Sequence, residues 1–171
     1  MRVMGIDNGL DGALVCLNSD GGISKLVMPT IESGTGKREY DVQVIVGFVL
    51  CYRPDHVFLE KAQAMPGQGV SSMFSIGNGY GIMRGIIGAL SIPHTLVHPK
   101  TWQKVMFKDV PKQDTKAASV KVCKRLFPQL DWKASDRCRK AHDGLTDAAL
   151  IAAYGMRELK VAIPKAEDTE F

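Results

Sequence analysis

Three short extended segments near the start of the chain constrain the fold more than any other feature. They are the apolar runs Arg2–Asp7, Ala13–Asn18 and Ile23–Met28. The turn-forming residues Asn8-Gly9 and Asp20-Gly21-Gly22 separate them. Strands joined by such short turns pair with their neighbours in antiparallel fashion. The sequence therefore predicts a three-stranded antiparallel meander.

The rest of the chain alternates between helical and extended segments. After a loop rich in Gly, Ser and Thr at 30–37, the pattern predicts helices over Tyr40–Tyr52, Ser71–Leu90, Thr101–Phe107, Thr115–Phe127 and Asp143–Leu159, and strands over His56–Glu60 and Pro93–Val97. A meander followed by such alternation is typical of α/β folds. We expect a mixed five-stranded sheet, in which parallel strands join the antiparallel meander and helices flank both. The RNase H-like architecture satisfies this order.

Length and composition suggest one domain. The chain has 171 residues, of which 45% are hydrophobic, and this size is within the ~100–200 residues typical of a single domain. We expect the domain to span residues 1–160. Residues 161–171 contain Pro164 and mixed charges, so we expect a flexible C-terminal tail.

Cysteine spacing and hydropathy indicate the compartment. Cys16, Cys51, Cys123 and Cys138 are widely separated, with no CxxC pair and no matching histidine cluster. Neither a zinc site nor a disulfide framework is indicated, which fits a reducing cytosol. The sequence shows no secretory signal and no apolar run near the ~20 residues of a membrane helix. We expect a soluble, cytoplasmic protein.

Positive charge is concentrated in one part of the chain. Residues 100–140 contain 12 Lys and Arg against 4 Asp and Glu, while the whole chain carries a net charge of +4. A cationic block of this kind favours a polyanionic partner, with nucleic acid first, because Lys and Arg gain affinity by displacing counterions from phosphates. The alternative is a solvated, lysine-rich helix face.

Four acidic residues stand where the predicted elements converge. Asp7 ends the first predicted strand and Glu60 ends the fourth. Asp143 and Asp147 lie four residues apart, on one face of the last predicted helix. If the two strands are neighbours, the helix can lay its acids against the strand ends. Crowded carboxylates repel, and divalent Mg²⁺ resolves that repulsion because it takes carboxylate oxygens as ligands. Two such ions can drive phosphodiester hydrolysis.

Each acid also has a purely structural interpretation. Asp7 can be a turn residue before Asn8, and Glu60 a surface charge at a strand end. Asp143 can cap the last helix, and Asp147 can interact with its positive end. Only the joint occurrence of the four acids at these chain positions favours metal binding.

The helix predicted over Ser71–Leu90 carries an unusual number of glycines. Gly77, Gly81, Gly85 and Gly88 recur every three or four residues and would form one smooth stripe. Glycine in a helix costs up to ~1 kcal/mol relative to alanine, so we interpret the stripe as a surface for close approach of DNA or of a second subunit.

Five segments together resemble a known family. They are MGIDNGLDGALV, HVFLEKAQAMPGQG, SSMFSIGNGYGIMRGIIGAL, HPKTWQKVMF and KAHDGLTDAALIAAYG. In this order they resemble RuvC-type Holliday-junction resolvases, which belong to the RNase H-like superfamily, and especially their divergent phage-like members. The resemblance spans about residues 1–157. It implies a homodimer that acts on four-way or branched DNA in the cytoplasm, at the nucleoid of a bacterial host.

The resemblance also implies site residues. In that family four acids bind two divalent metal ions, Mg²⁺ or Mn²⁺, and they correspond here to Asp7, Glu60, Asp143 and Asp147. Bacterial members commonly space the last two acids by three residues rather than four. The neighbouring His142 is a candidate metal or phosphate contact, or a capping residue.

Candidate DNA contacts follow from the same resemblance. They are Lys61, Gln63, Phe74, Lys100, Trp102, Lys104, Lys112 and Lys116. Lys116 matches best a lysine that stabilises the transition state near the scissile phosphate. Phe74 and Trp102 are candidates to stack on an unpaired base, although an aromatic residue beside an apolar run more often belongs to the core.

The function implied is a crossover junction endodeoxyribonuclease. It would make paired symmetric nicks by two-metal hydrolysis and leave 5′-phosphate and 3′-hydroxyl ends. Two alternatives stay open from the residues alone: another RNase H-like nuclease that acts on flaps or RNA–DNA hybrids, and a non-catalytic module that binds branched DNA.

Overall fold

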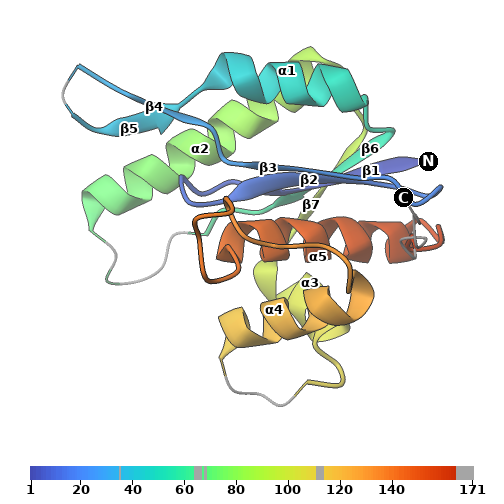
Figure 1. Cartoon of the computed structure of the whole chain (residues 1–171). Helices are drawn as coiled ribbons and strands as arrows, with labels where there is room; N and C mark the ends of the chain where they lie inside the picture. The colour runs from blue at the N-terminus through green and yellow to red at the C-terminus, as the bar shows by residue number, and fades with distance from the viewer. Residues whose placement is uncertain (35, 64–66, 68, 111–113, 165–171) are drawn as a thin grey trace.

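A five-stranded mixed sheet forms the centre of the computed structural model, which describes residues 1–34, 36–63, 67, 69–110 and 114–164 (Figure 1). Its strands are β1 (Arg2–Asp7), β2 (Ala13–Asn18), β3 (Ile23–Val27), β6 (His56–Glu60) and β7 (His94–Val97). They lie in the order β3-β2-β1-β6-β7. The meander strands pair antiparallel, whereas β6 and β7 join β1 in parallel. The predicted fold class is confirmed.

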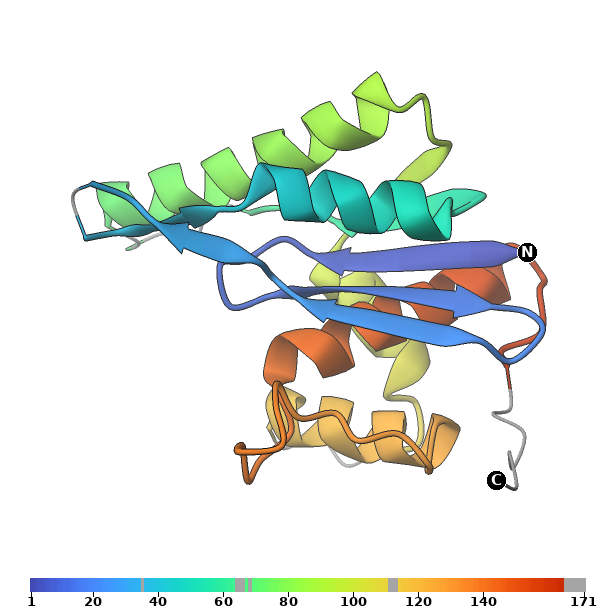
Figure 2. The same cartoon turned by 45° about the horizontal axis from the view of Figure 1, so that its top comes forward.

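Helices cover both faces of this sheet. One face carries α1 (Val42–Tyr52) and α2 (Val70–Ala89), and the opposite face carries α5 (Asp143–Glu158). The helices α3 (Pro99–Met106) and α4 (Thr115–Leu126) lie beyond α5, away from the sheet (Figures 1 and 2). All the predicted strands and helices are present, with ends shifted by one or two residues.

A small hairpin replaces part of the predicted loop at 30–37. The strands β4 (Thr30–Glu32) and β5 (Arg38–Tyr40) pair antiparallel in a separate two-stranded sheet beside α2 (Figure 1). Tyr40, which we had assigned to the following helix, ends β5 and is buried. Two strands of three residues are too short for a periodicity argument to detect, because each contains little more than one alternation.

The buried face of α4 differs in part from the prediction. The apolar spacing of Ala117, Val120, Cys123 and Phe127 in the sequence predicts that these residues point inward. Cys123 and Phe127 are buried, but Ala117 is exposed and Val120 is only partly buried. Ser119 and Val122 are buried in their place. Apolar residues occur on more than one side of α4, so its sequence alone did not define which face contacts α5.

The contact between α5 and β1 is unusually close. A Cβ atom at Gly5 of β1 would overlap the backbone of Ala148 and Ala152 in α5, and one at Gly144 would overlap the backbone of Gly12 in the β1–β2 turn. Glycine at Gly5 and Gly144 therefore lets the first half of α5 lie directly against β1. This approach fixes the distance between the end of β1 and the first turns of α5.

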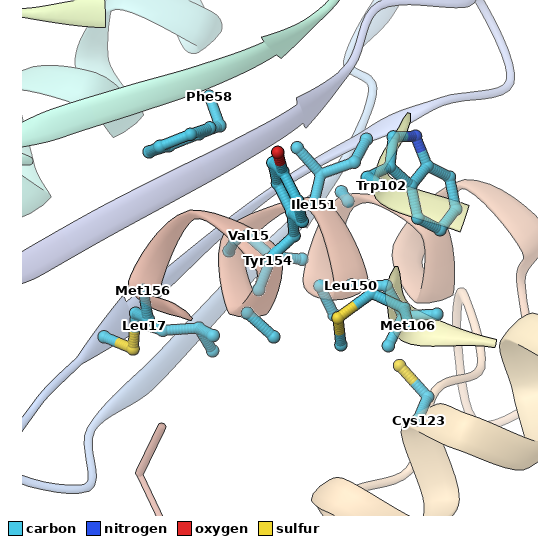
Figure 3. Close-up of a cluster of buried hydrophobic side chains, with 14 of the residues drawn as sticks. Val15, Leu17, Phe58, Trp102, Met106, Cys123, Leu150, Ile151, Tyr154 and Met156 are labelled. Atoms are coloured by element: carbon cyan, nitrogen blue, oxygen red, sulfur yellow. The ribbon is translucent and has the colours of Figure 1, made fainter. Parts of the chain in front are cut away.

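The core has one hydrophobic cluster on each side of the sheet. Met4, Ile6 and Leu59 point toward α1 and α2, while alternate residues of the same strands point toward α5. Figure 3 shows this second cluster, in which side chains from the strands, α5, α3 and α4 meet. Trp102 and Cys123 connect α3 and α4 to it.

No helix in the described part of the chain is long and apolar enough to cross a membrane. Residues 161–164 follow α5 without regular structure. The remainder of the predicted tail lies outside the described residues.

The close approach of α5 predicts which glycine tolerates a side chain. Gly5→Val should lower the free energy of unfolding by more than about 2 kcal/mol, because the valine side chain overlaps the α5 backbone. Urea unfolding followed by circular dichroism measures the change.

Gly47→Ala is the matched control. A Cβ at Gly47 on the exposed side of α1 would meet nothing within 4 Å, so this variant should be more stable by about 0.5–1 kcal/mol. Equal effects of the two substitutions would contradict the described packing.

Candidate active site

Two acidic residues lie side by side where parallel strands end. In the β1–β6 ladder Ile6 is opposite Leu59, so Asp7 and Glu60 each occupy the next position at the same edge of the sheet. Parallel strands carry their carboxyl ends to one edge. The predicted convergence of these two acids is confirmed as geometry.

Asn8 ties the two strand ends together. Its side-chain Nδ2 donates a hydrogen bond to the backbone oxygen of Glu60 at 3.1 Å, and its own backbone oxygen accepts one from the Tyr40 hydroxyl at 2.9 Å. Asp7 Oδ1 accepts a hydrogen bond from the Gly9 N–H at 3.2 Å. Burial raises the pKa of Asp7, and this hydrogen bond and the charge of His142 partly offset that rise.

A buried tryptophan orients Glu60. Trp102 Nε1 donates a hydrogen bond to Glu60 Oε1 at 2.9 Å, and the tryptophan is 0% exposed. Burial, together with the charges of Asp7 and Asp147, raises the pKa of Glu60 to about 7. The core interpretation of Trp102 is confirmed, and the alternative that its ring stacks on an unpaired base is wrong, because the ring is 0% exposed.

Asp147 of α5 points toward the same edge of the sheet. The Ser119 side chain of α4 forms a hydrogen bond with its carboxylate. Among the described residues, its Oδ1 atom is buried and has no hydrogen-bond partner. Burial raises the pKa of Asp147 to about 7, with further contributions from the charges of Asp7 and Asp143. A buried carboxylate oxygen without a partner is costly and fits a cation.

Asp143 is the most accessible of the four acids. It is the first residue of α5, and its Oδ2 lies 2.7 Å from Lys116 Nζ, with the two side chains 46% and 69% exposed. The bond to Asp143 raises the pKa of Lys116. His142 caps α5, since its Nδ1 accepts a hydrogen bond from the Leu145 N–H at 3.3 Å. The capping interpretation of His142 is thus confirmed.

The chemistry of these acids fits a divalent cation. Burial raises the pKa of Asp7, Glu60 and Asp147, and a bound cation would favour their charged forms. As the side chains stand, no three His, Cys, Asp or Glu residues of the described chain are grouped closely enough to hold an ion. Binding would therefore require the carboxylates to turn toward one another.

The other predicted contacts are spread along the surface. Lys61 follows Glu60 directly and is exposed, and Gln63 Nε2 lies 2.6 Å from His98 Nδ1. Lys100 is exposed at the start of α3, just after β7, whose Val97 is opposite Glu60.

The remaining predicted contacts lie further from the acids along the chain or outside the described structure. Lys104 is in the last turn of α3, and Phe74 on α2 is 77% exposed. Lys112 is outside the described residues.

Sequence reasoning missed the residues that orient the acids. Asn8 was interpreted as a turn residue only, and neither Tyr40 nor Ser119 was singled out. The sequence contained no signal for Asn8, because its burial, which makes hydrogen-bond partners necessary, is visible only in the structure. Nothing in the pattern of α4 marks Ser119 as a residue that contacts an acid.

Comparison with solved structures identifies the fold. Thermus thermophilus RuvC in complex with a Holliday junction substrate is 14% identical, with a TM-score of 0.55 over 96% of this chain and 100% of that chain. The yeast mitochondrial Holliday junction resolvase Ydc2 is 17% identical, with a TM-score of 0.60 over 91% of this chain and 77% of that chain. The fowlpox virus resolvase bound to substrate Holliday junction DNA is 15% identical, with a TM-score of 0.53 over 93% of this chain and 99% of that chain.

These similarities show that the chain has the RNase H-like fold of RuvC and related Holliday junction resolvases. Neither a protein-family model nor a curated protein sequence matches the chain. The fold is therefore recognisable from the structure, although the sequence identity to these resolvases is only 14–17%.

Removal of the buried charge of Asp147 should stabilise the protein, by an amount that depends on pH. In chelator, wild-type stability should fall as pH rises from about 4 to about 7, because the folded protein keeps a proton on Asp147 that the unfolded chain has lost. Asp147→Asn should be similar to wild type at pH 4.5 and more stable by about 2 kcal/mol at pH 8. Thermal unfolding across this range measures the difference.

Asp143→Asn is the control, because this carboxylate is half exposed and paired with Lys116. It should change stability by less than about 1 kcal/mol at any pH. A larger gain at pH 8 from Asp143→Asn than from Asp147→Asn would contradict the described burial.

Proposed function

We propose that this protein is a metal-dependent, structure-selective endodeoxyribonuclease that resolves four-way (Holliday) DNA junctions by paired symmetric nicks. One observation carries the proposal: acids from β1, β6 and α5 lie close enough at one edge of the sheet to interact electrostatically, in a fold shared with Holliday junction resolvases. Their electrostatic coupling supports one site, since the charges of Asp7 and Asp147 both raise the pKa of Glu60.

Asp7, Glu60, Asp143 and Asp147 would hold two divalent cations, Mg²⁺ or Mn²⁺. Such cations polarise the scissile phosphate and lower the pKa of the attacking water in an in-line displacement, which leaves 5′-phosphate and 3′-hydroxyl ends. The protein also contributes to catalysis through residues that hold the carboxylates in place. Trp102 and Ser119 each hold one acid through a hydrogen bond, so the acids are partly ordered before substrate arrives.

Lys116 is proposed to contact the reacting phosphate. Its ammonium group is exposed and lies 2.7 Å from Asp143, so it can exchange that carboxylate for a phosphate oxygen when DNA binds. A lysine beside the phosphate neutralises the negative charge that develops during displacement. Lys61, Gln63, Lys100, Lys104, Lys112 and Phe74 are proposed to contact the DNA around it.

A homodimer is part of the proposal, because a two-fold junction requires two matched cuts. The exposed side of α2 supports it: a Cβ at Gly77, Gly81, Gly85 or Gly88 would meet nothing within 4 Å. The close packing that this glycine stripe permits is therefore not used by the described part of the chain. Val70, also on α2, is 80% exposed.

Two other functions have to be separated from this one. A nuclease for flaps or RNA–DNA hybrids would use the same acids on another substrate. A non-catalytic binder of branched DNA is favoured by one observation, namely that no three candidate ligands of the described residues are grouped closely enough to hold a metal. Binding of Mg²⁺ or Ca²⁺ by the free protein, measured by calorimetry, would argue against the binder.

Asp7→Asn should abolish junction cleavage and leave junction binding within about threefold of wild type. The substitution removes the central carboxylate but keeps an acceptor for the Gly9 N–H. Gel assays on a labelled four-way junction measure both properties. Cleavage by Asp7→Asn at the wild-type rate would overturn the site assignment.

Lys116→Ala should slow single-turnover cleavage by at least 10²-fold, in the range typical of lost transition-state stabilisation. It should weaken junction binding by less than about 10-fold, because one phosphate contact is a small part of the affinity. Lys160→Ala removes an exposed lysine beyond the far end of α5 and should change neither quantity. Unchanged cleavage with a large loss of affinity would contradict the catalytic role of Lys116.

A further inference from the structure

A strongly basic groove lies beside the candidate active site. It runs between α4 and the segment that leads into α5, and its volume is about 720 Å³. Figure 2 draws these two parts of the chain next to each other, below the sheet. Five cationic residues line the groove: Lys116, Lys121, Lys124, Arg139 and Lys140. At one end it reaches Asp143, the acid that pairs with Lys116.

Most of this positive charge is not neutralised. The groove contains two acids, and both are engaged by Lys116: Asp114 accepts its backbone N–H at 3.0 Å, and Asp143 accepts its ammonium at 2.7 Å. Lys121 and Arg139 are exposed and form no ion pair with any described carboxylate. The same holds for Lys124 and Lys140.

The cations stand on both walls of the groove. Lys121 and Lys124 belong to α4, whereas Arg139 and Lys140 belong to the opposite segment. Val120, on the same face of α4 as Lys116 and Lys124, also lines the groove. A solvated lysine face would disperse its charges over a convex surface, whereas this arrangement concentrates them around a hollow, where a polyanion can contact both sides at once.

The length of the groove suits a nucleic-acid strand. Lys116 and Lys124 are eight residues apart on one face of α4, which corresponds to about 12 Å at the helical rise of 1.5 Å per residue. Each DNA strand carries one charge per about 3.4 Å of helix axis. A helix wall of this length, laid parallel to the duplex axis, would run beside about three to four phosphates of one strand.

We propose that this groove binds the sugar–phosphate backbone of the duplex arm that leads away from the cleavage point. The inference rests on the proposed function and assigns it an arm-binding surface, with Lys121, Lys124, Arg139 and Lys140 as phosphate contacts. Arg139 can bind two phosphate oxygens at once through its planar guanidinium. Because these contacts are to phosphate, they hold the arm without reading its sequence.

The test is the salt dependence of DNA binding. Each phosphate contact releases counterions, so log K decreases as log salt increases. The magnitude of this negative slope becomes smaller by about 0.9 for every contact that is removed. Lys121→Ala/Arg139→Ala should reduce the slope by about 2 and weaken binding by 10-fold or more at low salt. Binding is measured in chelator on a labelled four-way junction and on a linear duplex, and both should show the reduction. Circular dichroism confirms that the variant is folded.

Arg157→Ala/Lys160→Ala is the matched control. It removes the same charge at the other end of α5, where both residues are exposed. This variant should keep the wild-type slope, affinity and cleavage rate, because about 21 Å of helix separates Arg157 from Asp143 at the end of the groove.

The outcomes separate the two proposals. A wild-type protein that binds and cuts junctions, combined with a slope equally reduced by both variants or by neither, would overturn the groove and leave the proposed function standing. A wild-type protein that binds no DNA in any salt would overturn both. A slope reduced only by the groove variant, without cleavage by wild type, would support the groove and contradict the nuclease.

Discussion

The direct contact of α5 with β1 is the constraint on which the rest of the structure depends. Gly5 and the small residues Ala148 and Ala152 let a helix lie against the central strand without intervening side chains. That contact places Asp147 beside the ends of β1 and β6. It also exposes the outer side of α5 to α3 and α4, which supply Trp102 and Ser119. The contact between α5 and β1 thus positions both the acids and their hydrogen-bond partners.

The cost of this arrangement is electrostatic. Three carboxyl groups lie at the edge of a buried sheet, and burial raises the pKa of each. Folding alone gives no reason to retain Asp147, since one of its oxygens is buried without a partner among the described residues. Retaining such a group is reasonable where function requires it, because sites selected for chemistry are commonly not optimal for stability. The metal-binding interpretation rests on this conflict.

The helices and the five strands of the main sheet could be predicted from the sequence because their hydrophobic patterns and turn residues agree. The convergence of Asp7 with Glu60 was predictable too, since both end strands that a parallel pairing brings together. The hairpin β4–β5 was missed because its strands are short. The roles of Trp102 and Ser119 were missed for a different reason: the hydrogen bond of a core side chain depends on tertiary packing, and local pattern does not encode it.

Junction cleavage by the purified wild-type protein tests the central claim most directly. A labelled synthetic four-way junction is incubated with Mg²⁺ or with chelator, beside linear duplex, flap and RNA–DNA hybrid substrates. Our account predicts paired symmetric nicks on the junction alone, and only with metal. Junction binding without cutting under Mg²⁺ and Mn²⁺ would contradict it, and so would equal cutting of the hybrid or the flap.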